Sequence, residues 1–587
     1  MGSVVRATGI AGRGTAAIGL GAAVIGLLGP GHLGLGHLGL GAIARGRTAP
    51  HARATAAPLA RPTPSRTPIN FSLVLRLPGR ARLDRFLSEV NDPRSARYGR
   101  FIDARTFGRR YGVPAGALHA LTERLGLAGA TVVGRYPQRT ALDLRAPAGV
   151  VDRMFSVQLR DYVDQLGRPY HAPTGRPVIP RDLGGVVSAV AGLDSELPPR
   201  SPAHLVPAGG LTPVDTGRAY DLAPLARAGI QGQGQRLAVI SYATHNPADP
   251  AAFSQRFGLG GPAPQRVPVQ GGATDTSARN QLEADLDLEI AHSVAPAAQI
   301  LNYEAPLAGN VLVGPVLDTI VAQHRADVVS ISWGQCERSY RPGEIQRDNQ
   351  SILAADAAGV SVFVASGDQG AYDCQALNPS DQHLSVDWPG ASPGVIDVGG
   401  TSLSVAQDGS YAGEDGWEGV LSQRGSGGGL DAFFARPSWQ VAPGVQNRFS
   451  NGARQVPDVS ADADLTTGWT IVHAGQLIEV GGTSASAPFW AASMLLVRQY
   501  AQRQGVPGSG SARGALGGGA GGLGFVDPLL YQIASTPQPV PAFHDVTVGG
   551  NRYYPAGAGW DFATGLGSPD VYNLARDVVS YLRAHGH

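Results

Sequence analysis

Short runs of alternating apolar and polar positions characterise residues 70–195. The segments 71–77 and 140–145 have the alternation of half-buried strands, and 82–90 and 114–125 have the apolar spacing of helices. Further strands are predicted at 130–135, 157–162 and 186–193, and a short helix at 149–155. Strands and helices in this order are typical of an antiparallel α+β sandwich of the ferredoxin-like kind.

Continuous apolar runs, rather than alternating ones, characterise the region after residue 213. They cover residues 236–241, 298–303, 328–332 and 360–366, and helical stretches lie between them. Because strands buried on both faces are apolar throughout, this pattern predicts an α/β fold with a parallel sheet and helices on both faces. In such sheets, functional sites form at the carboxyl ends of the strands.

Composition places the boundaries between these regions. Residues 1–44 begin with arginines and an apolar stretch, which predicts a signal peptide or hydrophobic leader; a membrane anchor is the alternative. Residues 45–68 are rich in Arg, Ala, Thr and Pro and are expected to be a disordered linker. The α+β domain then spans 69–196, a Pro/Gly-rich linker with a candidate processing site spans 197–213, and the α/β domain spans 214–587.

Net charge and cysteine content bear on the class of partner and on the cellular compartment of the protein. The formal net charge of +1 over 587 residues gives no electrostatic basis for nucleic-acid binding. The abundance of Ala, Gly and Arg is typical of a GC-rich bacterium, and the leader predicts secretion to the extracellular space. In an exported protein the two cysteines, Cys336 and Cys374, suggest one disulfide, and two buried thiols are the alternative. They follow the runs 328–332 and 360–366, so we expect their loops to meet at the carboxyl edge of the sheet.

The first candidate for chemistry is the sequence GGTSASAP at residues 481–488, which precedes an apolar helical run at 489–500. A serine on a glycine turn at a helix N-terminus lies beside free backbone N–H groups, which stabilise a developing negative charge. Ser484 is therefore a candidate nucleophile for acyl transfer. The simpler interpretation is that Ser484 or Ser486 caps the helix.

The second candidate is a pair of acids in QLEADLDLEI, residues 281–290. Glu283 and Asp287 are four residues apart, which places them on one face of a helix about 6 Å apart along its axis. Two acids so close favour sharing a proton, which is the arrangement of a general base and its supporting acid. Asp285 and Glu289 are expected to be ordinary solvated acids, and a solvated helix face is the alternative for the first pair as well.

Two further stretches contain acids beside glycines. Asp368 follows an apolar strand in ASGDQGA, where an aspartate caps a helix, binds a metal or faces a substrate. Asp545 and Asp561 lie at a glycine-rich loop with many free carbonyls, and hard oxygen ligands of this kind suit calcium. An ordinary glycine-rich turn is the alternative for that loop.

In this combination and order, the motifs resemble those of the sedolisin family, the kumamolisin-like serine-carboxyl peptidases. The segments that precede GGTSASAP in the family's order are EADLDLE, VVSISWGQCE, SGDQGAYDC, VDWPGASPGVIDVGGTSL, GSGGGLDAFFARPSWQ and PDVSADAD. Residues 70–195 resemble the family's activation propeptide, including DPRSARYG and VIPRDLGGVVSAVAGL. The resemblance covers nearly all of residues 70–577. Its departures are small: LDAFF replaces the commoner aromatic-Ser after GGG, and ADADLTTG lacks the usual proline.

The resemblance implies a subtilisin-like α/β domain and a role for each motif. Ser484 is the implied nucleophile, Glu283 its general base, and Asp287 the acid that orients Glu283 and shares its proton. Asp368 is implied to help stabilise the oxyanion. The implied substrate cleft is bordered by Trp333, Gly427, Gly428 and Gly429. One implied structural calcium ion binds the side chains of Asp545 and Asp561 and the carbonyls of Val546, Gly557 and Gly559.

The function that follows is that of a secreted serine-carboxyl endopeptidase, of class EC 3.4.21, which hydrolyses peptide bonds through an acyl-enzyme. It is expected to be made as a self-processing zymogen, to be inhibited by its own propeptide, and to act as a monomer on proteins or peptides. A carboxylate base has an unperturbed pKa near ~4.3, and Asp368 donates to an oxyanion only while protonated, so we expect activity at acid pH.

Two alternative functions are compatible with the same fold. A subtilisin-like Ser/His/Asp peptidase carries an aspartate where RLAVIS places Ser241, and no His-Gly-Thr motif precedes HSVAPAA, so His292 is expected to be structural. A catalytically inactive, secreted binding protein is marked by the loss of a catalytic residue, and all four are present here.

Overall fold

The computed structural model describes residues 61–163, 168–196, 204–206, 210–307, 313–419, 423–506, 522–537 and 539–587, with backbone only for 204–206. The predicted leader at 1–44 lies outside the described residues, as do 45–60 of the first linker and most of the second. In the part of the chain that is described, no helix combines the length and the apolar character needed to cross a membrane.

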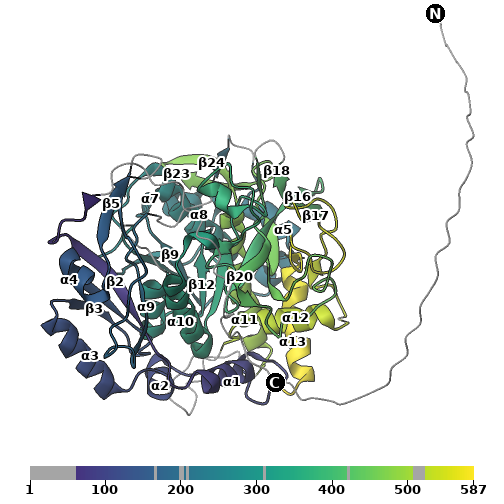
Figure 1. Ribbon diagram of the computed structural model, residues 1–587. Coiled ribbons are helices and arrows are strands. Elements are labelled where there is room, and N and C mark those ends of the chain that lie inside the picture. The colour runs from purple at the N-terminus through teal and green to yellow at the C-terminus, as the bar shows by residue number, and fades with distance from the viewer. Residues whose placement is uncertain are drawn as a thin grey trace, which may run out of the picture. The chain divides into compact units, whose positions relative to one another are not determined.

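Residues 61–196 contain a four-stranded antiparallel sheet with helices packed against it (Figure 1). Its strands, in spatial order, are β3 (Thr131–Arg135), β4 (Ala141–Pro147), β2 (Pro68–Leu75) and β7 (Val187–Ala191). The helices that share the core of this sheet are α3 (Ala115–Leu127) and α4 (Ala148–Phe155), whereas α1 (Arg80–Asn91) and α2 (Ala104–Arg110) pack in a core of the α/β domain. The βαββαβ connectivity and this strand order are those of the predicted ferredoxin-like fold.

The alternation along β2 explains how this domain uses both faces of its sheet. Phe71 and Leu73 are buried in a core that also contains Leu121 of α3 and Phe155 of α4. Val74, on the opposite face, packs near Tyr340 of the α/β domain. One face therefore forms the domain's own core, and the other faces the rest of the chain.

The first linker ends earlier than composition predicts. Arg61–Pro62 form β1, which pairs antiparallel with β5 (Leu159–Val163), and β6 (Pro169–Pro173) completes a three-stranded sheet. Thr63 Oγ1 donates a hydrogen bond to Asp161 Oδ1 at 2.7 Å. Composition measures only how poorly a segment builds its own core, so it misses a segment that gains order by pairing with another strand.

Residues 210–587 contain an eight-stranded sheet. The strands in spatial order are β10 (Gln265–Pro268), β11 (Gln299–Glu304), β9 (Arg236–Ser241), β12 (Val328–Ile331), β14 (Ser361–Ala365), β16 (Ile396–Val405) and β17 (Tyr411–Gly416), and β22 (Val459–Asp462) also pairs with β16. Only the β16–β17 pair is antiparallel among them. The predicted parallel sheet is thus confirmed.

Helices cover both faces of this sheet. Along β9, Leu237 and Val239 belong to the core that contains α11, and Ala238 and Ile240 belong to the core that contains α9 and α10. The helices of this domain are α5 (Pro213–Ala219), α6 (Ala223–Arg227), α7 (Ala248–Phe257), α8 (Ala278–Val294), α9 (Gly314–Gln323), α10 (Pro342–Ala358), α11 (Thr483–Arg503), α12 (Asp527–Ser535) and α13 (Val571–Ala584). Side chains on both faces of the central strands are buried, as their continuous apolar sequence requires.

Short strands form the rest of the described secondary structure. They are β13 (Gln335–Cys336), β15 (Asp387–Trp388), β18 (Glu418–Gly419), β19 (Arg424–Gly425), β20 (Gly429–Ala435), β21 (Ala453–Val456), β23 (Trp469–His473), β24 (Gln476–Gly481), β25 (Phe543–His544) and β26 (Ser568–Pro569). Within the second linker, β8 (His204–Val206) pairs antiparallel with β24, and His204 lies opposite Gly481. A linker strand therefore adjoins the strand that leads into Ser484.

A buried ion pair joins the α+β domain to the α/β domain. Arg347 of α10 is fully buried, and its Nη2 lies 2.8 Å from Asp318 Oδ2 of α9 and 3.4 Å from Asp143 Oδ1 of β4. Ser72 Oγ and Tyr136 OH also donate to the Asp143 carboxylate, at 2.6 and 2.5 Å. A second pair, Arg341 with Asp194, spans the same interface at 2.5 Å.

An aromatic side chain also crosses this interface. Phe101 of the α+β domain lies so close to Gly359 and Gly524 that a Cβ at either glycine would fall 2.3 Å from its ring. Nearby, Tyr98 OH donates to Leu523 O at 2.9 Å and Ile102 N donates to Ala357 O at 2.8 Å. Part of the α+β domain thus fits into the surface of the α/β domain.

Candidate active site

Ser484 lies in the first turn of α11, directly after strand β24. Gly482 precedes the helix with φ of 113°, a conformation that only glycine adopts without strain, and its N–H donates to Ala463 O at 2.7 Å. Ser484 is fully buried, and its Oγ makes no hydrogen bond with the described residues. Ser486 Oγ instead donates to Ala461 O at 2.9 Å, so Ser486 holds α11 against β22.

Glu283 and Asp287 are fully buried on α8. Burial, followed by the neighbouring charge of Glu283, raises the pKa of Asp287 well above its usual value. Ser332, at the end of β12, donates its Oγ proton to Asp287 Oδ1 at 2.6 Å and also lies 3.3 Å from Ser484 O. The two acids therefore interact on one helix, as their spacing predicts, and the contact of Asp287 with Ser332 was not predicted.

The hydrogen-bonded chain expected through Glu283, Asp287 and Ser484 is not formed. Asp287 Oδ2 and Ser484 Oγ are both buried and accept or donate no hydrogen bond among the described residues. A bond between two carboxyl groups requires a shared proton, and catalytic hydrogen bonds commonly tighten only when substrate is bound. Asp287 and the Ser484 backbone are instead both contacted by Ser332.

Asp368 follows β14 and is tied to the residue before Ser484. Its Oδ1 accepts hydrogen bonds from Thr483 N at 2.8 Å and Thr483 Oγ1 at 3.0 Å. Burial raises the pKa of Asp368 to about 7, and the Thr483 N–H and the Arg424 charge oppose this rise. Asp368 is therefore a carboxyl group that is protonated in acid and is hydrogen-bonded to Thr483, the residue that precedes Ser484.

A cavity of about 220 Å³ opens beside these groups. The residues that line it are Arg279, Ser332, Gly334, Gln335, Ala365, Gly367, Asp368, Gln369, Asp373, Gln375, Ala376, Asp387 and Arg424. It therefore contains both Asp368 and Ser332, the two side chains that reach Thr483 and Asp287. The cavity therefore adjoins the acidic groups.

The residues expected to border the substrate cleft do not line this cavity. Trp333 is 1% exposed and packs edge-on against Tyr242, because its indole ring enters the core beside α9 and α10; its neighbours Ser332 and Gly334 line the cavity instead. The stretch Gly427, Gly428 and Gly429 does not line the cavity. Gly427 N donates to Gly367 O at 2.8 Å, so this stretch lies against the loop that carries Asp368.

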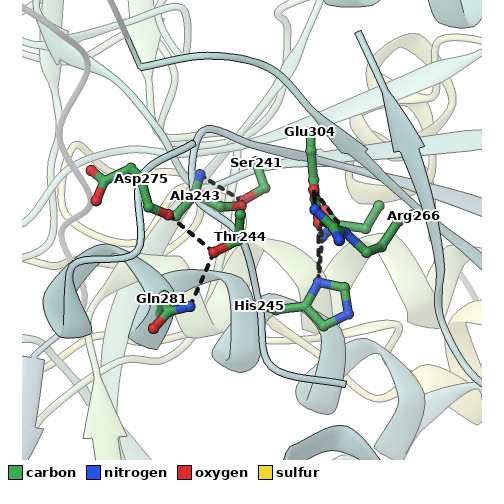
Figure 2. A network of polar contacts seen from close by, with 9 residues as sticks. Ser241, Ala243, Thr244, His245, Arg266, Asp275, Gln281 and Glu304 are labelled. Carbon is green, nitrogen blue, oxygen red and sulfur yellow. Dashed lines mark hydrogen bonds and ion pairs between the residues drawn. The ribbon is translucent and has the colours of Figure 1, made fainter. Parts of the chain in front are cut away.

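The position that would hold a subtilisin aspartate is occupied by a locally bonded serine. Ser241 Oγ donates to Ala243 O at 3.0 Å, and Figure 2 shows this contact beside Thr244, which bonds Gln281 of α8. His292 is buried, burial lowers its pKa, and its Nδ1 has no hydrogen-bond partner among the described residues. A Ser/His/Asp arrangement around Ser484 is therefore not built by Ser241 or His292.

This chain is similar to known proteins over most of its length. Residues 57–196 match the family model "Pro-kumamolisin, activation domain", and residues 271–510 match the model "Subtilase family". Kumamolisin from Bacillus sp. (strain MN-32) is 34% identical over 468 residues, which cover 74% of this chain and 78% of that protein. Sedolisin from Pseudomonas sp. (strain 101) is 31% identical over 562 residues, which cover 91% of this chain and 90% of that protein.

The chain belongs to the sedolisin family of serine-carboxyl peptidases. It is thus a serine-type peptidase preceded by an activation domain. A solved structure of Pseudomonas sedolisin, complexed with two molecules of pseudo-iodotyrostatin, is 29% identical, with a TM-score of 0.54 over 65% of this chain and 100% of that one. The predicted subtilisin-like fold of the α/β domain is confirmed.

A disulfide lies near the cavity of this sedolisin-family chain. Cys336 of β13 and Cys374 are bonded, with their Cα atoms 4.9 Å apart, and neither is a free thiol. The bond joins the loops after β12 and β14, two neighbouring strands, as their position in the sequence predicted. Gln335 on one loop and Gln375 and Ala376 on the other line the cavity, so the disulfide ties two of its walls together.

The calcium ligands expected from the sedolisin family lie around one loop. Asp545 accepts hydrogen bonds from Gly559 N at 3.0 and 3.1 Å, and Asp561 Oδ2 accepts one from Gly557 N at 2.9 Å. Burial raises the pKa of Asp561 to about 6, and hydrogen bonds from the N–H groups of Gly557, Thr564 and Ala563 oppose that rise. Both carboxyl groups contact the 557–559 loop, and carboxylate oxygens are among the hard ligands that calcium prefers.

Two other acids of α8 are not solvated, contrary to expectation. Asp285 is 1% exposed and Glu289 is fully buried. The helix is covered on this side by α7 and the β23–β24 hairpin: Val472 N donates to Glu289 Oε2 at 2.7 Å, and His473 Nδ1 lies 2.8 Å from Asp285 Oδ2. The sequence around α8 alone carries no sign of these distant elements.

Proposed function

We propose that this chain is an acid-acting serine-carboxyl peptidase, made as a zymogen that cleaves off its own activation domain. One observation carries the proposal: Asp368 bonds Thr483, while Ser332 bonds Asp287 and approaches the Ser484 carbonyl. Carboxyl groups from β14 and α8 thus converge on the serine that begins α11. Family membership supports the reaction class.

In the proposed mechanism, Glu283 accepts the proton of Ser484 Oγ as the oxygen attacks the substrate carbonyl. Burial and their mutual charge favour one shared proton on the Glu283–Asp287 pair, so one carboxylate remains as the base, and we assign that role to Glu283. Asp368, protonated in acid, donates a hydrogen bond to the oxyanion. Glu283 then returns its proton to the leaving amine, and water hydrolyses the acyl-enzyme by the same steps.

The pKa of Asp368 sets the upper pH limit of this mechanism. Because the group donates only while protonated and its pKa is about 7, we expect casein hydrolysis to decline as the pH rises through about 7. Asp368→Asn should lower the rate in acid but remove that decline, since an amide donates at every pH. The measurement is the pH–rate profile of both proteins on casein.

The profile also separates the proposal from its alternatives. A wild-type optimum at alkaline pH contradicts a carboxyl mechanism and favours a histidine-based one. No hydrolysis at any pH, by a chain that has lost its activation domain, favours an inactive binding protein. Loss of the decline in Asp415→Asn, an exposed aspartate of β17, would show that the effect does not belong to Asp368.

We further propose that the α+β domain is the inhibitor of the peptidase. It is held by the Arg347–Asp143 and Arg341–Asp194 pairs, and β8 lies against the strand that precedes Ser484. Both ion pairs cross the interface between the two domains, so loss of either carboxylate charge should weaken the docking.

Asp143→Asn should speed processing, because asparagine mimics the protonated carboxyl group and removes the charge that faces Arg347. A hydrogen bond to a charged group is worth about 1.5–3 kcal/mol, so processing should be about 10–100-fold faster at a pH where the wild type is slow. A gel time course measures this. Asp84→Asn, which removes an ion pair 2.7 Å long inside the same domain, serves as the matched control. Because Asp143 is removed with the domain, the mature enzymes are identical, and equal processing rates contradict the proposed role.

Calcium is proposed as a structural ion held by Asp545 and Asp561 with the carbonyls of Val546, Gly557 and Gly559. It offsets carboxylate charge at this loop and takes no part in catalysis. A chelator should therefore lower the melting temperature by several degrees, while Asp545→Asn should lower it without chelator and remove the chelator's effect. Differential scanning fluorimetry with and without added calcium measures this; a melting temperature that ignores calcium contradicts the site.

Secretion is proposed from the leader at 1–44 and is consistent with a disulfide, which persists in oxidising compartments. If this leader is cleaved, protein recovered from the culture medium should lack the residues that precede the cleavage site. N-terminal sequencing of that protein, compared with the cell-associated form, distinguishes a cleaved signal from a membrane anchor. We expect a monomer, which size-exclusion chromatography tests.

A further inference from the structure

The four acids of α8 divide into two pairs on opposite sides of the helix. Asp285 is two residues from both Glu283 and Asp287, and at about 100° per residue this turns it about 200° away from them. The mechanism uses Glu283 and Asp287 only. Asp285 and Glu289 are nevertheless as deeply buried as the catalytic pair.

Asp285 lies in a cluster drawn from three separate elements. Asp249 in the first turn of α7, Asp285 in the middle of α8 and His473 at the end of β23 each offer one atom within 4.8 Å of the others. Asp249 is 3% exposed, and the His473 side chain is 15% exposed. The Asp249 carboxylate also accepts hydrogen bonds from Ala474 N and Gly475 N, at 3.1 and 2.8 Å, so the β-hairpin turn fixes its position.

Two carboxylate oxygens on this side of α8 have no hydrogen-bond donor among the described residues, and one of them belongs to the cluster. Asp285 Oδ1 and Glu289 Oε1 are buried and make no hydrogen bond within the described residues. Arginine forms no ion pair with Asp249, Asp285 or Glu289 in the same part of the chain. Buried carboxyl groups normally have hydrogen-bond or charge partners, so these orphaned oxygens point to a cationic ligand.

We propose that Asp249, Asp285 and His473 bind a divalent transition-metal ion of the zinc type. Zinc takes imidazole nitrogen and carboxylate oxygen at about 2.0–2.2 Å, so two tetrahedral ligands of one ion are about 3.3 Å apart. His473 Nδ1 and Asp285 Oδ2, at 2.8 Å, need only a small separation to admit the ion between them. The fourth position falls to water.

Calcium does not suit this site. It prefers six to eight oxygen ligands, and here an imidazole takes one of three protein positions. The cluster also shares no residue with the C-terminal calcium loop, so the two sites are independent. A metal here fastens α8 to α7 and to the β23–β24 hairpin, on the side of α8 opposite its catalytic acids.

The experiment uses the full chain without an affinity tag and with Ser484→Ala, so that it stays intact. After removal of metals by chelation, Zn2+ is titrated at pH 7 in excess Ca2+, which occupies sites made only of oxygen. Isothermal titration calorimetry should show one Zn2+ per chain. His473→Ala should raise the dissociation constant for Zn2+ by more than about 100-fold, since loss of even an outer-shell partner lowers metal affinity by about 10–100-fold.

Two control variants decide the assignment. His383→Ala removes an exposed histidine that also lies 2.8 Å from an aspartate, Asp381, and should leave Zn2+ binding unchanged. Asp545→Asn should abolish the calcium effect on stability and leave Zn2+ binding unchanged. If His473→Ala fails to fold, the isosteric Asp285→Asn takes its place. No stoichiometric Zn2+ binding, or equal binding in the cluster variants and the His383 variant, overturns the proposal.

Discussion

Replacing Ser484 by alanine should leave the activation domain attached at acid pH, whereas the wild-type chain should lose it. The physical reason is proximity: β8 pairs with β24, and His204 lies opposite Gly481, three residues before Ser484 in the same chain. A cleavage site held so close to the nucleophile reacts intramolecularly. Purified protein shifted to pH 4 and followed by gel and mass spectrometry measures processing, and the new N-terminus should fall within 197–213.

Ser486→Ala is the matched control for this experiment. It makes the same chemical change two residues along α11, but Ser486 Oγ bonds the Ala461 carbonyl and does not adjoin the acids. We expect a modest loss of stability, about 1 kcal/mol for the lost hydrogen bond, and retained processing. Wild-type processing should also be first order and independent of protein concentration. Processing of purified Ser484→Ala, or a rate that rises with concentration, contradicts self-cleavage within one chain.

Glu283→Gln should reduce kcat by about 10³–10⁴-fold while leaving the fold unchanged. Glutamine keeps the size of the side chain but accepts no proton from Ser484, and loss of a positioned general base costs about 10²–10⁴-fold. It also removes a charge from a fully buried site beside Asp287, so the melting temperature should not fall. Because the variant will process itself slowly, cleavage of its activation domain by added protease precedes the kinetic assay.

The corresponding control is Glu418→Gln, the same substitution at an exposed position of β18. Its kcat and KM on one peptide substrate should equal those of the wild type. An unchanged kcat in Glu283→Gln would show that Glu283 is not the general base and that another group accepts the Ser484 proton. A loss of activity accompanied by a large fall in melting temperature would instead indicate a structural role for Glu283.

Local sequence was sufficient where an element's environment is uniform. Strand β9 has the predicted bounds, because a strand buried on both faces is apolar at every position. Helical spacing predicted that Glu283 and Asp287 share one face of α8, and the order of strands in a parallel sheet predicted the disulfide. Helix α2 was missed, since Gly108 and three arginines give Ala104–Arg110 weak helical periodicity and its Asp103 cap was not recognised.

Local sequence failed where distant elements decide the environment. Asp285 and Glu289 have the same residue types and spacing as Glu283 and Asp287, so no local rule shows which pair is covered. Burial came from α7 and the β23–β24 hairpin, which lie about 30 and 190 residues away in the chain. Trp333 turned into the core for a similar reason, because the Tyr242 ring that receives it comes from a different strand connection.

The close contact of Phe101 with Gly359 and Gly524 should make the α+β domain and the α/β domain evolve together at these positions. These glycines leave space for the Phe101 ring, which the proposed processing would remove with the activation domain. Selection on the mature peptidase alone would let that space fill, whereas selection on the newly made chain preserves it. Exchange of activation domains between relatives should therefore succeed only when the recipient keeps room at both positions, and substitutions at Phe101 should be inherited together with changes at its two glycines.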